Sequence, residues 1–281
     1  MARGVMAWDT FQIVLESISW HRDAVKVVVL YHGGEPLLNK KFFDMVRAVK
    51  RSVPAMVKTV SNGTVMTQRI ASEFIASGLD AVEFSIDGES ADQNDRIRRG
   101  ARCSNVVLSI RAVMAAKAAA GALHPRIFLS TTQFINPALP LDKQVPAAPE
   151  FLKREFEAEI ANGEISDIKA TFAMRWPHMT VLDELYDVCL DSNGTEIQNE
   201  CDHVLNTVYI RSNGDVVPCC YDLTSRAVMG NVHHAALETI WNNTRYRALR
   251  QSIAEMKFIP LCENCNVVKP NAYLVPKAGT L

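Results

Sequence analysis

The chain has 281 residues, of which 48% are hydrophobic and 22% are charged, and its formal net charge at pH 7 is −1. These values are typical of a globular protein with room for one large α/β domain and a small appendage. The near-zero charge gives no basic surface for nucleic acid, and the longest apolar runs fall far short of the ~18 residues that span a bilayer. The first residues show no signal-peptide pattern, so we expect a cytoplasmic protein with neither nucleic acid nor a membrane as a partner.

Strand and helix patterns alternate along the first two thirds of the chain. A β-branched run at residues 24–30 predicts a buried parallel strand. We expect further strands at residues 55–60, 81–86, 126–132 and 165–173. Apolar residues at helical spacing predict helices at residues 8–20, 39–49, 67–78, 104–121 and 149–160, with Asn39, Thr67 and Ser104 as N-caps. Strand–helix units with short connections predict parallel strands wound with a right-handed sense.

The loop after the first strand contains the most distinctive motif, Gly33-Gly34-Glu35-Pro36. Two glycines let the backbone approach a ligand without an intervening Cβ atom. Pro36 restricts Glu35 to an extended conformation, which holds this carboxylate at the carboxyl end of a strand. Open α/β sheets and barrels bind their ligands at that edge.

Two further strands also end in polar or glycine-containing loops. Ser61-Asn62-Gly63 follows the second strand, and Ser85-Ile86-Asp87-Gly88 ends the third. Because parallel strands end at the same edge of a sheet, we expect one ligand site, called the rim site here, built from these three loops.

The pattern changes in the last third of the chain. Residues 174–200 predict an irregular linker with a short helical piece. Asn213-Gly214 lies between two short β-rich runs and predicts a hairpin, and a helix is expected at residues 237–253.

The seven cysteines are placed unevenly, because only Cys103 lies in the first 188 residues. The predicted hairpin brings Cys219 back toward Cys201, and a C-x-x-C pair follows the last predicted helix at Cys262 and Cys265. Four such thiolates can hold either a zinc ion or an iron–sulfur cluster, and their spacing does not distinguish the two. Cys220 is expected to point away from Cys219, because neighbouring side chains alternate in an extended segment.

Taken together, these motifs resemble those of radical S-adenosylmethionine (radical SAM) enzymes. The resemblance rests on Gly33-Gly34-Glu35-Pro36, on Ser61-Asn62-Gly63-Thr64 and on Ser85-Ile86-Asp87-Gly88 with the basic segment at residues 94–100. It implies an α/β fold: a partial (β/α)6 TIM-like barrel with parallel strands, lacking the first strand and cluster loop, followed by a small Cys-rich domain of a β-hairpin and helix.

The region from Cys201 to Cys265 is similar to SPASM-type C-terminal domains. No cysteine follows Cys265, so the resemblance is to the shortened, single-cluster version called Twitch. It implies that Cys201, Cys219, Cys262 and Cys265 bind one auxiliary [4Fe–4S] cluster. The implied domains are residues 1–175 for the partial barrel, 176–200 for a linker and 201–281 for the auxiliary cluster domain.

One motif of the family is missing from these residues. The C-x-x-x-C-x-x-C loop that binds the SAM-cleaving cluster would precede the helix at residues 8–20, and no such triad occurs in residues 1–100. We interpret this as a truncated N-terminus rather than as natural loss. A second [4Fe–4S] cluster is therefore expected only in a longer form, and the 281 residues by themselves are expected not to cleave SAM.

The resemblance implies that SAM binds at the rim site and that its radical chemistry modifies a small molecule or peptide, by oxidation or rearrangement. A flavodoxin or ferredoxin would be a suitable reductant. The implied SAM-binding residues are Gly33, Gly34, Glu35, Pro36, Asn62, Ser85, Asp87, Arg96 and Arg98. No residue is singled out as catalytic. The alternatives are a non-catalytic iron–sulfur partner protein derived from the family and an α/β protein with a structural zinc site.

Overall fold

The computed structural model describes residues 4–140, 143–174, 184–190, 197–263, 265–269 and 272–277. The chain divides into two compact units. The sheet unit comprises residues 18–133 and 145–172, and the cysteine unit comprises residues up to 17, 134–144 and 173–280.

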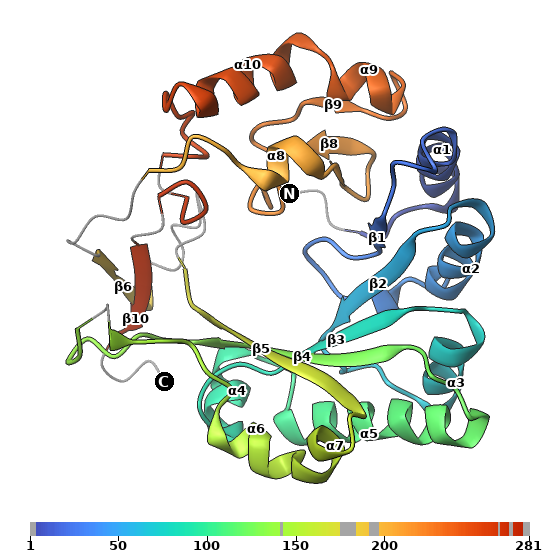
Figure 1. Cartoon of the computed structure of the whole chain (residues 1–281), viewed down its shortest axis with the longest axis vertical. Coiled ribbons are helices and arrows are strands. Elements are labelled where there is room, and N and C mark those ends of the chain that lie inside the picture. The colour runs from blue at the N-terminus through green and yellow to red at the C-terminus, as the bar shows by residue number, and fades with distance from the viewer. Residues whose placement is uncertain are drawn as a thin grey trace. The chain divides into compact units, whose positions relative to one another are not determined.

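A five-stranded, wholly parallel sheet forms the centre of the sheet unit, with the strands in chain order β1-β2-β3-β4-β5 (Figure 1). The strands are β1 (Val27–Val29), β2 (Met56–Ser61), β3 (Ala81–Ser85), β4 (Arg126–Gln133) and β5 (Ile165–Phe172). A strand lies at each of the five expected places, so the α/β class with parallel strands is confirmed. The expectation of a buried first strand is wrong: β1 lies at the edge of the sheet, with no described strand on its other side, and Val27 and Val29 are exposed.

The helices of this unit lie along one face of the sheet in Figure 1. They are α2 (Phe42–Ser52), α3 (Gln68–Ala76), α4 (Ala91–Ile97), α5 (Cys103–Ala120), α6 (Glu150–Glu155) and α7 (Glu157–Ala161), with a short 3-10 helix η1 (Pro36–Leu38). Side chains alternate across the strands, so Val57, Val82 and Phe84 are fully buried, whereas Met56 is 47% exposed. The apolar core thus lies between the sheet and its helices.

Helix α5 is the one described helix that is long and apolar enough to cross a membrane by length and composition. Its apolar side chains, among them Val106, Ile110 and Val113, are buried in the core of the sheet unit. Helices in the core of a globular protein can be equally long and apolar, and the buried side chains of α5 show that it packs as a core helix.

Two of the expected helix caps are wrong. Arg102, not Ser104, is the N-cap of α5, because the helix begins one residue before Ser104. Lys41, not Asn39, is the N-cap of α2, and the Asn39 carboxamide oxygen instead accepts a hydrogen bond from the Lys41 amide (3.0 Å). Thr67 caps α3 as expected, with its hydroxyl accepting from the Ile70 amide.

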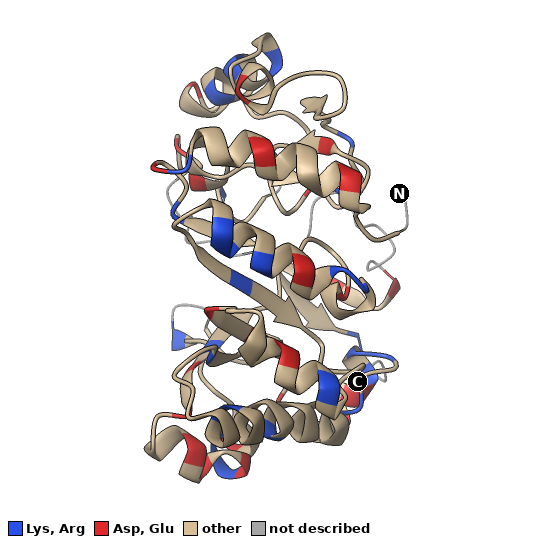
Figure 2. Cartoon of the chain, turned by 90° about the vertical axis from the view of Figure 1, so that its right-hand side faces the viewer, with Lys and Arg blue, Asp and Glu red and all other residues tan. Residues whose placement is uncertain are grey.

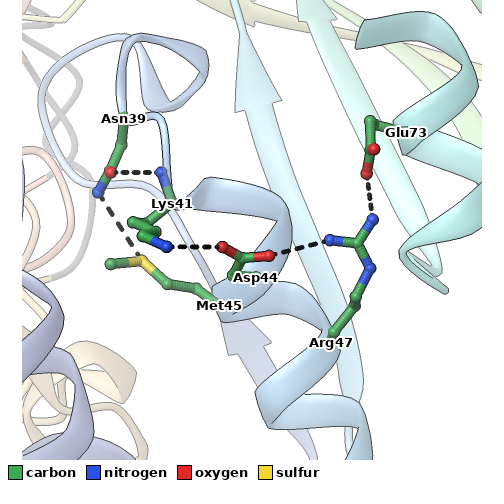
Figure 3. A network of polar contacts seen from close by, with 6 residues as sticks. All are labelled: Asn39, Lys41, Asp44, Met45, Arg47 and Glu73. Atoms are coloured by element: carbon green, nitrogen blue, oxygen red, sulfur yellow. Dashed lines mark hydrogen bonds and ion pairs between the residues drawn. The ribbon is translucent and has the colours of Figure 1, made fainter. Parts of the chain in front are cut away.

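Ion pairs link the N-cap residue of α2 to its first turn, and they also link α2 to α3 (Figure 3). Asp44 accepts from Lys41 (3.3 Å) and from Arg47 (3.2 Å), and Arg47 also pairs with Glu73 of α3. Basic and acidic residues are interspersed in this way over the helices that face the viewer in Figure 2, as expected from the near-zero net charge.

The cysteine unit contains two small sheets. The predicted hairpin is confirmed as antiparallel β7 (Tyr209–Ile210) and β8 (Asp215–Val217), and β9 (Gly230–Asn231) pairs with β8. Strand β6 (Tyr186–Leu190) pairs antiparallel with β10 (Ala272–Pro276). The expected linker at residues 174–200 therefore contains a strand at 186–190, and its residues 175–183 and 191–196 lie outside the described residues.

The helix expected at residues 8–20 is confirmed as α1, whereas the helix expected at residues 237–253 is divided into two. The helices of the cysteine unit are α1 (Trp8–Trp20, which belongs to this unit up to Ser17), α8 (Asp202–Asn206), α9 (Leu237–Trp241) and α10 (Thr244–Ala254). The single helix expected at residues 237–253 is interrupted because Asn243 starts a new helix, accepting from the Tyr246 amide (2.9 Å) through its side-chain oxygen.

Candidate functional site

The Glu35 carboxylate joins two of the rim loops. Glu35 is extended (φ −106°, ψ 109°), as the following proline predicts, and it is the N-cap of η1. One carboxylate oxygen accepts from the Leu37 amide (3.1 Å) and the Ser61 hydroxyl (2.9 Å), and the other accepts from the Asn62 amide (2.7 Å). The carboxylate is therefore held in place by donors from its own loop and from the end of β2.

The loop after β2 is organised by Ser61, whose role the sequence did not reveal. Its hydroxyl donates to Glu35 and accepts from the Gly63 amide (3.0 Å). The Asn62 side-chain oxygen accepts from the amide and the hydroxyl of Thr64 (2.9 and 2.7 Å), so it stabilises its own loop. Gly63 has φ +70°, and an added Cβ would lie 3.2 Å from Val106, so this position requires glycine.

A pair of hydroxyls lies where β3 ends beside β4. Ser85 on β3 is opposite Ser130 on β4, and the two hydroxyl oxygens are 3.3 Å apart. Hydroxyl groups can donate or accept, so this pair can meet a ribose hydroxyl or a carboxylate. Sequence reasoning identified Ser85 but missed Ser130, because the partner is 45 residues away along the chain.

Asp87 and Arg98, two of the predicted cofactor-binding residues, bind each other. Arg98 Nε donates to one Asp87 oxygen (2.7 Å), and the Thr132 amide donates to the other (2.8 Å). Asn94, which is fully buried, accepts from the Asp87 amide (3.0 Å) through its side-chain oxygen. This network stabilises the loop after β3, and none of the described contacts joins the exposed Arg96 to it.

Replacing Arg98 by alanine is therefore expected to lower the free energy of unfolding by about 1–2 kcal/mol, because the nearly buried Asp87 carboxylate loses its charged donor. Replacing Arg96 by alanine is expected to change it by less than about 0.5 kcal/mol, since that side chain is on the surface. Urea unfolding of the two variants measures the difference. Equal effects would show that the Asp87–Arg98 pair does not stabilise this loop.

The two glycines of the motif leave space beside the backbone. Gly33 has φ +67°, a conformation that favours glycine. A Cβ added to Gly34 would meet no atom within 4 Å, so open space borders the chain next to the ordered Glu35 carboxylate. An ammonium group can approach the backbone here and pair with a carboxylate oxygen, since each such oxygen can accept more than one hydrogen bond. The residues present thus fit the amino group of SAM.

The structure brings the four predicted metal ligands together. Cys201, Cys219, Cys262 and Cys265 are all buried. Burial raises the pKa of every one of these thiols, to about 12 for Cys262, and the pKa of Cys262 is raised further by Cys265 and Cys201. The pKa of Cys219 is likewise raised by burial first and by Cys265 among smaller causes, and Cys201 raises the pKa of Cys265. Cys265 therefore interacts electrostatically with each of the other three thiols.

The donor set of this site, called the thiol site here, fits an iron–sulfur cluster held by four cysteines. Buried thiols that repel one another as thiolates need a cation to hold them in that form, and a metal centre supplies it. Among the described residues, no three His, Cys, Asp or Glu side chains already form a site for a single metal ion.

Two protein families match parts of the chain. Residues 3–119 match the radical SAM superfamily, and residues 201–266 match the SPASM family, described as an iron–sulfur cluster-binding domain. The tungsten-containing aldehyde ferredoxin oxidoreductase cofactor-modifying protein of Pyrococcus furiosus is 27% identical over 301 aligned residues, covering 94% of this chain and 80% of that protein.

Two solved structures have a similar fold. BtrN in complex with AdoMet and 2-DOIA matches with a TM-score of 0.54 at 17% identity, over 94% of this chain and 82% of BtrN. Streptococcus suis SuiB bound to precursor peptide SuiA matches with a TM-score of 0.57 at 11% identity, over 95% of this chain and 66% of SuiB. With both family matches in the expected order along the sequence, the chain is a radical SAM superfamily protein with a C-terminal SPASM domain.

Proposed function

We propose that this chain binds SAM at the rim site and one auxiliary [4Fe–4S] cluster at the thiol site, and that it serves the radical modification of a small molecule or peptide. The observation that carries the proposal is the burial of Cys201, Cys219, Cys262 and Cys265, with Cys265 interacting electrostatically with each of the other three, in a chain that also contains the ordered Glu35 rim. The functional division at residues 1–175, 176–200 and 201–281, the Twitch type of the last part and a cytoplasmic location belong to this proposal.

Each rim residue has a definite task in this proposal. Glu35 is pre-oriented by three donors, so it can receive the SAM ammonium without first becoming ordered. The Gly34 backbone borders the space that this group enters, and the Ser85–Ser130 hydroxyls meet the ribose or the carboxylate. Asp87 and Arg98 stabilise the loop that positions Ser85.

When bound, SAM and a reduced cluster supply the radical chemistry, and the chain positions the reacting groups and excludes water. The relatives' names and titles point to small-molecule and peptide substrates: 2-DOIA for BtrN, a precursor peptide for SuiB and a cofactor-modifying role for the Pyrococcus protein. We propose a substrate from one of these two classes, with a flavodoxin or ferredoxin as the reductant.

The 281 residues contain no C-x-x-x-C-x-x-C loop, and this observation favours a second candidate for the chain by itself. In that case it binds an iron–sulfur cluster or zinc and uses the rim to hold a ligand without cleaving SAM. We expect no 5′-deoxyadenosine from the 281-residue chain incubated with SAM and dithionite. Formation of this product would exclude the second candidate.

The test of the proposed cluster is anaerobic analysis of iron, sulfide and zinc, together with an absorption spectrum. We expect about four irons and four sulfides per chain with a broad absorption band near 400 nm. One zinc per chain without sulfide would contradict the cluster and leave a structural metal site.

A further inference from the structure

A cavity of about 480 Å³ lies in the sheet unit, at the edge of the sheet opposite the rim site. It is bordered by the first residues of three neighbouring parallel strands, Met56 of β2, Ala81 of β3 and Arg126 of β4. A volume of this size is within the range of small-molecule sites. The cavity is called the Arg126 pocket here, and the lining residues that matter below are Lys50, Met56, Asp80, Ala81, Arg126 and Phe128.

An ion pair in the lining of the Arg126 pocket is held in place by the backbone. Lys50 of α2 donates to both carboxylate oxygens of Asp80 (2.9 and 2.7 Å), and one of these oxygens also accepts from the Val57 amide (2.7 Å). The Asp80 carbonyl accepts from the Arg126 amide (2.8 Å), which ties the start of β4 to the start of β3. The charges of Lys50 and Asp80 therefore neutralise each other, and this part of the lining is fixed before a ligand binds.

The Arg126 guanidinium, by contrast, has no carboxylate partner among the described residues. Its Cζ atom lies 5.0 Å from the centre of the Phe128 ring, which also lines the pocket. Lys169 lies over the same ring at 4.6 Å, but its ammonium group is paired with Glu83 (2.9 Å). Arg126 thus places an unbalanced positive charge beside an aromatic side chain at a cavity.

The rest of the lining is mainly apolar, and it limits the kind of ligand that fits. Met56 is 47% exposed and Phe128 is partly exposed, so both offer apolar surface to the cavity. Apolar surface next to one unbalanced cation suits a ligand with an apolar body and a single negative charge. A carboxylate matches Arg126 well, because its two oxygens can accept two parallel hydrogen bonds from a guanidinium. A dianion would bring a second negative charge toward Asp80, and no free cation of the pocket would balance it.

We propose that the Arg126 pocket binds a small monocarboxylic acid with an apolar body. Its carboxylate pairs with Arg126, and its body packs against Met56 and Phe128. This inference goes beyond the proposed function, because binding here needs neither SAM nor a cluster. Arg126 and Ser130 are four residues apart on β4, which is about 13 Å at about 3.3 Å per residue. A ligand confined to the pocket therefore leaves the Ser85–Ser130 hydroxyls accessible, so both sites can be occupied together.

NMR spectroscopy of the 281-residue chain with ¹³C-labelled methionine methyl groups tests the site. The probe is 3-phenylpropionate, and 3-phenylpropan-1-ol and 3-phenylpropylamine have nearly the same shape with a neutral or a positive end group. We expect the Met56 signal, assigned with Met56→Leu, to shift with a Kd on the order of 1 mM for the carboxylate. The amine should bind at least about tenfold more weakly. The signal of Met45, which is buried under α2, should not shift.

Replacing Arg126 tests the anchor. Arg126→Gln is expected to weaken binding of 3-phenylpropionate at least about tenfold and to leave the affinity for 3-phenylpropan-1-ol within about twofold, because only the charged contact is lost. Arg126→Lys keeps the charge without the paired donors and should lie between wild type and Arg126→Gln. Arg69→Gln is the matched control, since Arg69 is an exposed arginine on α3, and its affinity should equal that of wild type.

Three results would overturn the inference. They are an unchanged carboxylate affinity in Arg126→Gln, equal affinity of wild type for the carboxylate and the amine, and a Met56 signal that none of the probes shifts. The last two are measured on wild type and do not depend on how any Arg126 variant folds.

Discussion

Replacing Cys262 by alanine is expected to reduce the iron content from about four per chain to less than about 0.4, a loss of at least tenfold. Cys262 is buried, and Cys265 and Cys201 both act electrostatically on its thiol. Three thiolates would leave one iron of the cluster without a protein ligand in the middle of the site.

The matched control for this variant is Cys103→Ala. Cys103 is also a buried thiol, and its pKa is raised to about 11 by burial and then by Asp95 and Glu155, but it lies in the sheet unit on α5. Iron content should be unchanged in this variant. Equal iron loss from Cys103→Ala and Cys262→Ala would mean that general destabilisation, not ligand removal, releases the metal.

The pH dependence of the same site follows from the direction of its pKa shifts. In the metal-free protein the pKa values of the thiols are raised, so the thiols remain protonated at neutral pH, and each thiol that binds iron must release a proton. Protons therefore compete with the metal. Iron retention in the presence of a chelator should fall as the pH is lowered from 8 to 6, and it should rise again with increasing pH.

Replacing Glu35 by alanine is expected to lower the free energy of unfolding by about 2 kcal/mol. The variant leaves three donors of the rim without their acceptor, namely the amides of Leu37 and Asn62 and the Ser61 hydroxyl. Amide hydrogen exchange at Leu37 and Asn62 should accelerate together, because one carboxylate holds both loops. Glu35→Gln keeps one acceptor oxygen, so its free energy of unfolding should lie between those of wild type and Glu35→Ala.

Glu150→Ala is the matched control, since the Glu150 side chain is 73% exposed and pairs with Lys153 on the surface (2.6 Å). Surface ion pairs contribute little to stability, so Glu150→Ala should lower the free energy of unfolding by less than about 0.5 kcal/mol. If Glu35→Ala cost no more than this control and exchange at Asn62 were unchanged, Glu35 would not connect the two loops.

Local features of the sequence were sufficient to predict most of the elements. The runs predicted as strands became β1 to β5, of which β2, β3 and β4 bury most of their apolar side chains, and apolar periodicity marked the helices that pack on the sheet. The extended Glu35 before Pro36, the Thr67 cap and the Asn213-Gly214 hairpin were correct because each depends on residues within a few positions.

The wrong local predictions have a common cause. Asn39 and Ser104 are good capping residues, but the packing of α2 and α5 moved their first turns by a residue or more. The pairing of β6 with β10 was missed because those strands are far apart in the sequence, and such pairing has no local signature.

Residue types in the sequence determined that this protein has a ligand rim and a thiol site. The tertiary structure decided which groups work together there. Glu35 found its partners at Ser61 and Asn62, more than 25 residues away, and Ser85 found its partner at Ser130, 45 residues away. Composition and spacing set the chemistry that is available, whereas the partners of each polar group depend on which distant segments the packed core brings into hydrogen-bonding range.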